Sequence, residues 1–343
     1  METGSPTDWI RLSTGVLPVR ERRLALLLTP LLLIAVWFIA LWYASDRGIP
    51  LTIVHTAFPA FLLEAVLYVL AGLEPVRARV GTMRPVAAAG LLVGLSPVSW
   101  LLLTIPLHGF DVSHLLGLVS LAAVAAFWFV ILPRHDATDL GFLVLMAAPI
   151  LAGMFETIYP DPAPRLPGEI LGALVWYRTG LVAVLSIRHM EGIGFGFIPR
   201  RAEWVIGVRN FLWFLPLGAA LAAATSFVRL RDIAWDGRTL LLAILTFVGV
   251  LWVLAVAEEF FFRGLLQQQL SRLFGSNAAG LILASAIFGA AHLGYREFPN
   301  WRFSLLAMLA GIFYGRAYIE GRGIRAAMVT HALVVTTWKI FLT

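Results

Sequence analysis

Long apolar stretches alternate with short polar breaks along almost the whole chain. A helix needs roughly 20 apolar residues to cross a bilayer, and Leu24–Ala44 reaches this length without a charged side chain. The pattern predicts an all-α protein, a polytopic transmembrane helix bundle of about 11 spans. The predicted spans are Leu24–Ala44, Pro50–Leu73, Pro85–Pro106, Leu115–Leu132, Leu140–Ile158, Ile170–Ile187, Trp204–Phe227, one from Thr239 onward, Ala278–Leu293, Phe303–Ile319 and Ile324–Leu342.

The composition also indicates a membrane protein. Of the 343 residues, 60% are hydrophobic and 13% are charged, and the mean hydropathy is +0.86, whereas roughly 25% of the residues of a soluble domain are charged. The net charge is +6, but the arginines stand in small groups between apolar stretches, as in loops that face an anionic leaflet. We therefore expect an integral, multi-pass protein that contacts the lipid bilayer and binds no nucleic acid. The absence of cysteine excludes disulfides and cysteine-ligated metal sites.

The distribution of arginine predicts an orientation, because cytoplasmic loops carry an excess of Lys and Arg. The breaks Glu74–Arg84 and Arg188–Arg201 hold three arginines each, and His108–His114 holds none. This alternation predicts an N-terminus on the inside, although Arg229–Arg238 places three arginines on the predicted outer side.

The polar stretch Arg188–Glu203 is the predicted domain boundary. Residues 1–203 are expected to form an N-terminal multi-span membrane region of unknown role. Residues 204–343 contain the side chains with recognisable chemistry. A charge within a membrane costs roughly 2.5–3.5 kcal/mol, so each ionisable side chain there is a candidate functional residue.

Four such side chains lie in the N-terminal spans, namely His55, Glu64, Glu156 and Arg178. A pairing of Glu64 or Glu156 with Arg178 would neutralise buried charge and lock helices together. The same residues allow a proton or ion path, so a transporter or channel is an alternative function. A transporter of this kind would have two related halves, and the sequence has no such symmetry.

The densest group of charges is Glu258-Glu259-Phe260-Phe261-Phe262-Arg263, which follows a long apolar run. On a helix Glu259 and Arg263 are four residues apart and can pair. Glu258 is turned away by about 100° and stays without a charge partner. An unpaired carboxyl group in a site of low dielectric constant suits a general base or acid. The alternative is a helix that leaves the membrane with ordinary interfacial charges.

Two histidines follow on later helices. Glu258 and His292 lie at similar distances on either side of the turn at Gly275, about 25 Å by helix rise. On antiparallel neighbours they would be level and could hold and deprotonate a water molecule. The same count leaves His331 about 10 Å from this level, a difference that helix tilt or offset could absorb, so its place in a site has less support from geometry.

The ordered motifs resemble the CPBP family of intramembrane proteases, which includes the CAAX prenyl endopeptidases and bacterial relatives. They are Glu-Glu-x-x-x-Arg, then Phe-x-x-x-His, then His, and the resemblance covers about Thr239–Thr343. The matching residues are Glu258, Glu259, Arg263, Phe288, His292 and His331. The resemblance implies a location in the bacterial inner (plasma) membrane.

The resemblance implies an intramembrane endopeptidase that hydrolyses a peptide bond in a membrane-associated protein or peptide substrate. By similarity, Glu258 and His292 would activate the attacking water. Glu259 with Arg263 would hold the site or the substrate backbone. His331 would help to stabilise the oxyanion, where a hydrogen-bond donor contributes several kcal/mol.

One position departs from the family pattern. The family usually has Asn or Asp four residues after the third-motif histidine, and this chain has Val335. Valine cannot donate a hydrogen bond, so a catalytically impaired scaffold is a second alternative. Thr336 or Thr337 could compensate for the missing donor.

We expect no cofactor for this chemistry. The alternative is a divalent metal such as zinc, held by Glu258, His292 and His331 with an open position for water. The sequence lacks a His-Glu-x-x-His motif, so the metal-free, glutamate-activated water is preferred.

Overall fold

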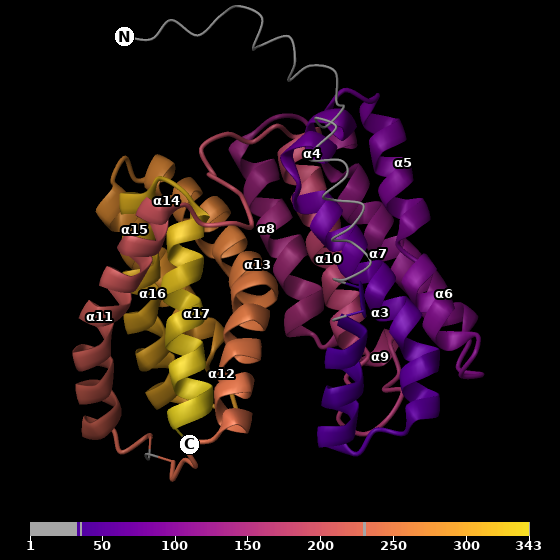
Figure 1. Cartoon of the computed structure of the whole chain (residues 1–343). Coiled ribbons are helices and arrows are strands. Elements are labelled where there is room, and N and C mark those ends of the chain that lie inside the picture. Colours follow the sequence, from indigo (N-terminus) through magenta and orange to yellow (C-terminus); the bar gives the residue numbers. More distant parts are fainter. Residues whose placement is uncertain (1–32, 35, 229–230, 343) are drawn as a thin grey trace, which may run out of the picture.

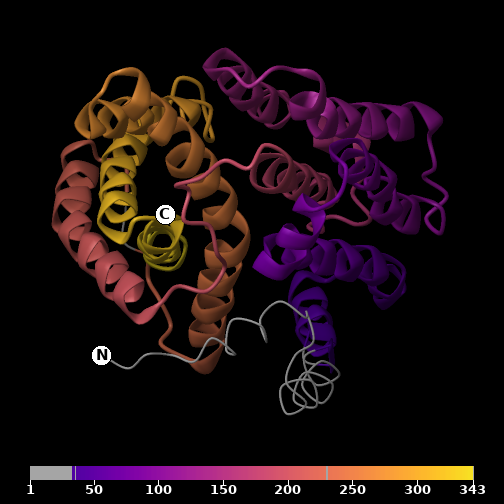
Figure 2. The ribbon, with the colours of Figure 1, turned by 90° about the horizontal axis from the view of Figure 1, so that it is seen from above.

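The computed structural model describes residues 33–34, 36–228 and 231–342. These residues are mostly helical, and among them the only β-type pairing is an isolated bridge between Ala163 and Leu166. The predicted all-α fold is confirmed for this part of the chain. Residues 36–187 gather in one bundle and residues 201–341 in a second bundle beside it (Figures 1 and 2).

The N-terminal bundle is built around a central helix. It contains a helix at residues 36–47, α3 (Leu51–Gly72), α4 (Glu74–Gly81), α5 (Pro85–Leu95), α6 (Val98–Thr104), α7 (Val112–Ile131), α8 (Asp136–Leu151), α9 (Met154–Ile158), α10 (Glu169–Val182) and the π-helix η1 (Ala183–Ile187). Helix α10 packs against α3, α6, α7, α8 and α9. The helix formed by α10 and η1 is 78% buried over its most apolar window, which is much more than its neighbours. It forms the core of this bundle.

A buried ion pair joins three helices of this bundle. Arg178 of α10 donates to the Glu64 carboxylate of α3 over 2.5 Å, and Ser99 of α6 donates to the second Glu64 oxygen over 2.9 Å. Glu64 is 0% exposed and Arg178 is 2% exposed. The predicted pairing of Glu64 with Arg178 is therefore confirmed. A buried charge needs such a partner, because an isolated one is strongly destabilising.

The C-terminal bundle contains the predicted motifs. Its elements are α11 (Arg201–Ala224), α12 (Gly237–Gly249), η2 (Val250–Leu254), α13 (Ala255–Glu259), η3 (Phe260–Gln267), α14 (Gln268–Leu273), α15 (Asn277–Ala291), α16 (Trp301–Gly321) and α17 (Ile324–Phe341). Polar N-caps fix several helix starts: Asp236 accepts from the backbone of α12, Ser276 from α15 and Asn300 from α16. Helix α16 packs against α11, α15 and α17.

The chain around the first motif departs from α-helical geometry. The π-helices η2 and η3 lie on either side of α13, whose last two residues are Glu258 and Glu259. The depth estimate from the sequence assumed a regular α-helix here, and this assumption is wrong. Each π-turn accommodates an extra residue and so changes the direction in which the following side chains point. Such π-turns are frequent at functional sites.

Six helices of the described residues are long and apolar enough to cross a membrane, so about 11 spans are not confirmed. They are Leu51–Gly72, Pro85–Thr104, Val112–Ile131, Glu169–Ile187, Arg201–Ala224 and Gly237–Leu273. The predicted span Leu140–Ile158 is wrong, because the helix ends at Leu151 and Gly153 adopts a left-handed conformation (φ 63°). Residues 1–32 and 35 lie outside the described residues; they include 24–32 and 35 of the predicted span Leu24–Ala44 and the segment on which the orientation of the N-terminus depends.

The two bundles are linked by residues 188–200 and touch at several points. Helix α8 packs against η3. Gly194 of the linker has φ 60°, and a Cβ atom there would lie 2.4 Å from the Cα atom of Gly323. At the opposite end, Arg238 donates to the Asp46 carboxylate over 2.6 Å. These contacts fix a defined interface between the bundles, and the first motif lies along it.

Candidate active site

The two adjacent glutamates of the first motif have different environments. Glu259 is 0% exposed, and the Glu258 side chain is 24% exposed. They are consecutive on α13, so they point in different directions, as predicted from the helix geometry. Only Glu258 is open to an incoming molecule.

The predicted ion pair between Glu259 and Arg263 is confirmed. The Arg263 Nε atom lies 3.2 Å from Glu259 Oε2, and both side chains are 0% exposed. The guanidinium group also donates to the Gly311 carbonyl over 3.1 Å. It lies over the rings of Phe288 and Tyr314, at 4.6 and 5.2 Å from their centroids. Arg263 is therefore enclosed, and it holds neighbouring helices together at the base of the site.

His331 lies in the site, contrary to the depth estimate. Its Nδ1 atom is 2.7 Å from Glu259 Oε1, and its Nε2 atom is 3.8 Å from Glu258 Oε2. The Tyr314 ring stacks on the imidazole at a centroid distance of 4.5 Å and an angle of 12°. The predicted offset of about 10 Å is wrong because helix rise alone does not fix the relative height of non-consecutive helices.

His292 lies directly after the last residue of α15. Its Nδ1 atom is 2.7 Å from the Phe288 carbonyl oxygen. A carbonyl oxygen only accepts, so Nδ1 carries the hydrogen and the neutral ring leaves Nε2 as an acceptor. The Phe288 ring lies 4.6 Å from the imidazole and also contacts His331, at 6.1 Å between centroids. Phe288 thus packs beside residues of the other two motifs, Arg263 and His331.

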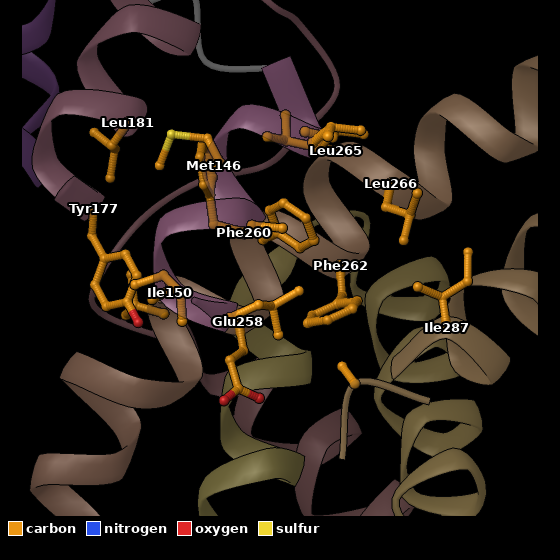
Figure 3. Close-up of a pocket in the computed structure, with 18 of the residues that line it drawn as sticks. Met146, Ile150, Tyr177, Leu181, Glu258, Phe260, Phe262, Leu265, Leu266 and Ile287 are labelled. Carbon is orange, nitrogen blue, oxygen red and sulfur yellow. The ribbon is translucent and has the colours of Figure 1, made fainter. Parts of the chain in front are cut away.

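Glu258 and His292 line one cavity of about 430 Å³. Figure 3 shows Glu258 among other residues that line it. Its other walls are mostly aliphatic and aromatic, and part of them comes from the N-terminal bundle. Those residues are Tyr68 of α3, Leu143 and Met146 of α8, and Tyr177 and Leu181 of α10. The sequence interpretation missed this contribution, because no motif marks it. The volume and the apolar lining with few polar groups are typical of a site for a small ligand or a segment of substrate.

The cavity reaches the surface between α8 and α15. Val144 and Leu151 of α8 and Ile287 of α15 all line it, and they are 69, 71 and 44% exposed. Their exposed apolar side chains suit contact with lipid chains. Exposed apolar side chains therefore border the cavity.

The arrangement does not fit the alternative metal site. Within the part of the chain that the structure describes, no three His, Asp or Glu side chains are grouped so that they could hold a metal ion. Glu258, His292 and His331 are thus not assembled as a ligand set, and metal-free chemistry remains a prediction.

Val335 lies in an apolar environment. Its side chain is half-buried and packs against the main hydrophobic cluster. The neighbouring Thr336 hydroxyl is buried without a hydrogen-bond partner among the described residues. Neither side chain lines the cavity that contains Glu258.

Fold and site define a helical membrane protein with a carboxylate and an imidazole in an apolar cavity. A family model, type II CAAX prenyl endopeptidase Rce1-like, matches residues 240–337. This match confirms the resemblance predicted from the three motifs for the C-terminal segment, and it indicates a protease. Comparisons with curated proteins and with solved structures each found no match. Together with the long apolar helices, the family match indicates an integral membrane protein.

Proposed function

We propose that the protein is an intramembrane endopeptidase that hydrolyses a peptide bond in a membrane-associated protein or peptide. One observation carries the proposal: Glu258, the accessible carboxylate of the motif, lines an apolar cavity together with His292. A cavity that opens on the apolar surface suits a substrate that arrives through the bilayer. We also propose the bacterial inner membrane as its location, with the N-terminus inside.

In the proposed mechanism Glu258 acts as the general base. It takes a proton from a water molecule whose oxygen attacks the carbonyl carbon of the substrate, and His292 Nε2 accepts the second hydrogen of that water. The carbonyl electrons move to oxygen. The oxyanion electrons then re-form the C=O bond as the C–N bond breaks, its electron pair goes to the amine nitrogen, and Glu258 delivers its proton to that nitrogen.

The buried residues would position these groups. Glu259 is neutralised by Arg263 and accepts the hydrogen of His331 Nδ1, so His331 Nε2 is turned toward Glu258. Because Arg263 is 0% exposed, we assign it to holding the site rather than to binding the substrate backbone. His331 is 2% exposed, and it would act on the reaction mainly through Glu258.

The test is cleavage of a panel of membrane-anchored peptides by the purified protein in lipid vesicles. The Glu258→Gln variant keeps the size of the side chain and removes the base, so we expect kcat to fall by roughly 10²–10⁴-fold. Glu156→Gln is a matched control, because this carboxylate lies on α9 and does not line the cavity. Equal rates for wild type and Glu258→Gln would remove Glu258 from the mechanism.

The substitution at Val335 motivates a second candidate, a scaffold that has the protease fold without activity. It predicts that wild type cleaves no peptide and that Val335→Asn gains activity, while both remain folded. Cleavage by wild type excludes this candidate. Cleavage by Val335→Asn alone would support it.

A further inference from the structure

A hydrogen-bond donor from the N-terminal bundle lies in the same cavity as Glu258. Among the described residues that line the cavity, three side chains contain hydrogen-bond donors: Tyr68, Tyr177 and His292. Hydrolysis of a peptide bond creates negative charge on the carbonyl oxygen, and in a mostly apolar cavity that charge needs a hydrogen-bond donor. The three candidates can be distinguished by how their hydrogens are used.

Two of these candidates are poorly suited to donate a hydrogen bond to the substrate carbonyl oxygen. The His292 hydrogen on Nδ1 is committed to the Phe288 carbonyl over 2.7 Å, which leaves an acceptor on the other side of the ring. The Tyr68 residue is 3% exposed, and its hydroxyl oxygen is enclosed without a partner. Its ring packs edge-on against Phe197 at 5.5 Å. A substrate would reach neither hydrogen without a rearrangement.

The Tyr177 hydroxyl is neither committed to another group, as the His292 hydrogen is, nor enclosed, as the Tyr68 hydroxyl is. Tyr177 is half-buried, and its hydroxyl makes no hydrogen bond within the part of the chain that the structure describes. It projects from α10, the helix that is fixed by the buried pair of Arg178 and Glu64. Figure 3 shows the Tyr177 ring across the cavity from Glu258, with the hydroxyl at the end of the ring nearer to the carboxylate.

We propose that the Tyr177 hydroxyl donates a hydrogen bond to the substrate carbonyl oxygen as it becomes an oxyanion. The inference rests on the proposed function and adds a catalytic residue to it. As water oxygen bonds to the carbonyl carbon, the π electrons move to oxygen, Glu258 receives the proton of the water, and Tyr177 keeps its own proton. The N-terminal region, which lies outside residues 240–337, then supplies a donor that Val335 cannot supply.

The experiment compares kcat and KM of Tyr177→Phe with those of wild type on one peptide that wild type cleaves in vesicles. The variant removes a single oxygen atom and keeps the ring. Loss of an oxyanion donor lowers kcat by roughly 100-fold, and we expect KM and the midpoint of unfolding to change little. A purely structural role would instead change the unfolding midpoint or KM.

Tyr159→Phe is the matched control. Tyr159 also lies in the N-terminal bundle with a buried hydroxyl that has no partner among the described residues, but it does not line the cavity. A kcat for Tyr177→Phe within threefold of that for Tyr159→Phe would overturn the inference. The outcome is separate from the proposed function, which fails if wild type and Glu258→Gln cleave equally.

Discussion

Removing the positive charge at position 263 should destabilise the protein more than any other single change in the site. In Arg263→Met, the Glu259 carboxylate loses its partner while it stays 0% exposed. Loss of one partner of a buried ion pair costs about 3–5 kcal/mol. The hydrogen bond to the Gly311 carbonyl is also lost, which contributes about 1 kcal/mol. We therefore expect a loss of roughly 4–6 kcal/mol in the free energy of unfolding.

The assay is unfolding of the purified protein in mixed micelles, followed by tryptophan fluorescence and helical circular dichroism. Glu259→Gln is the second variant, because the amide oxygen can still accept from His331 Nδ1 while the charge is gone. The double variant has no unpaired charge, so it should be more stable than Arg263→Met by at least about 2 kcal/mol. A loss below about 1 kcal/mol for Arg263→Met, or losses that simply add in the double variant, would refute this reasoning.

Two further changes test the surroundings of the site. Gly194→Ala combines a left-handed backbone with a clash against the Gly323 backbone, so we expect the free energy of unfolding to fall by roughly 2–5 kcal/mol in the same assay. The control is Gly94→Ala, because nothing lies within 4 Å of its new methyl group. Equal stability of the two variants would contradict the clash. Tyr314→Leu removes the ring that stacks on His331, so kcat for peptide cleavage should fall by more than in Tyr314→Phe. A larger fall in Tyr314→Phe would argue that stacking does not orient the His331 imidazole.

The local features of the fold were predictable from the sequence. The four-residue spacing of Glu259 and Arg263 predicts an ion pair because side chains at this spacing share a helix face. The charges of Glu64 and Arg178 predict a partnership because a buried charge needs one. The length of a span was less predictable, since Gly153 ends a helix within an apolar run that composition alone treats as continuous.

The spatial relations between distant helices were not predictable in the same way. The offset expected for His331 was wrong because counting residues from a turn assumes straight α-helices with a common origin. The chain contains π-turns on both sides of Glu258, and α17 begins at its own height. The presence of Tyr177 in the cavity depends on how the two bundles pack, and neither hydrophobic period nor motif spacing encodes that packing.

The exposed apolar rim formed by Val144, Leu151 and Ile287 has a kinetic consequence. A substrate that reaches Glu258 past this rim is dissolved in lipid, so its effective concentration is a surface density, namely the number of peptide molecules per lipid. Diluting enzyme and substrate together with buffer would then leave the turnover rate unchanged, whereas adding empty lipid to the same vesicles would slow it in proportion.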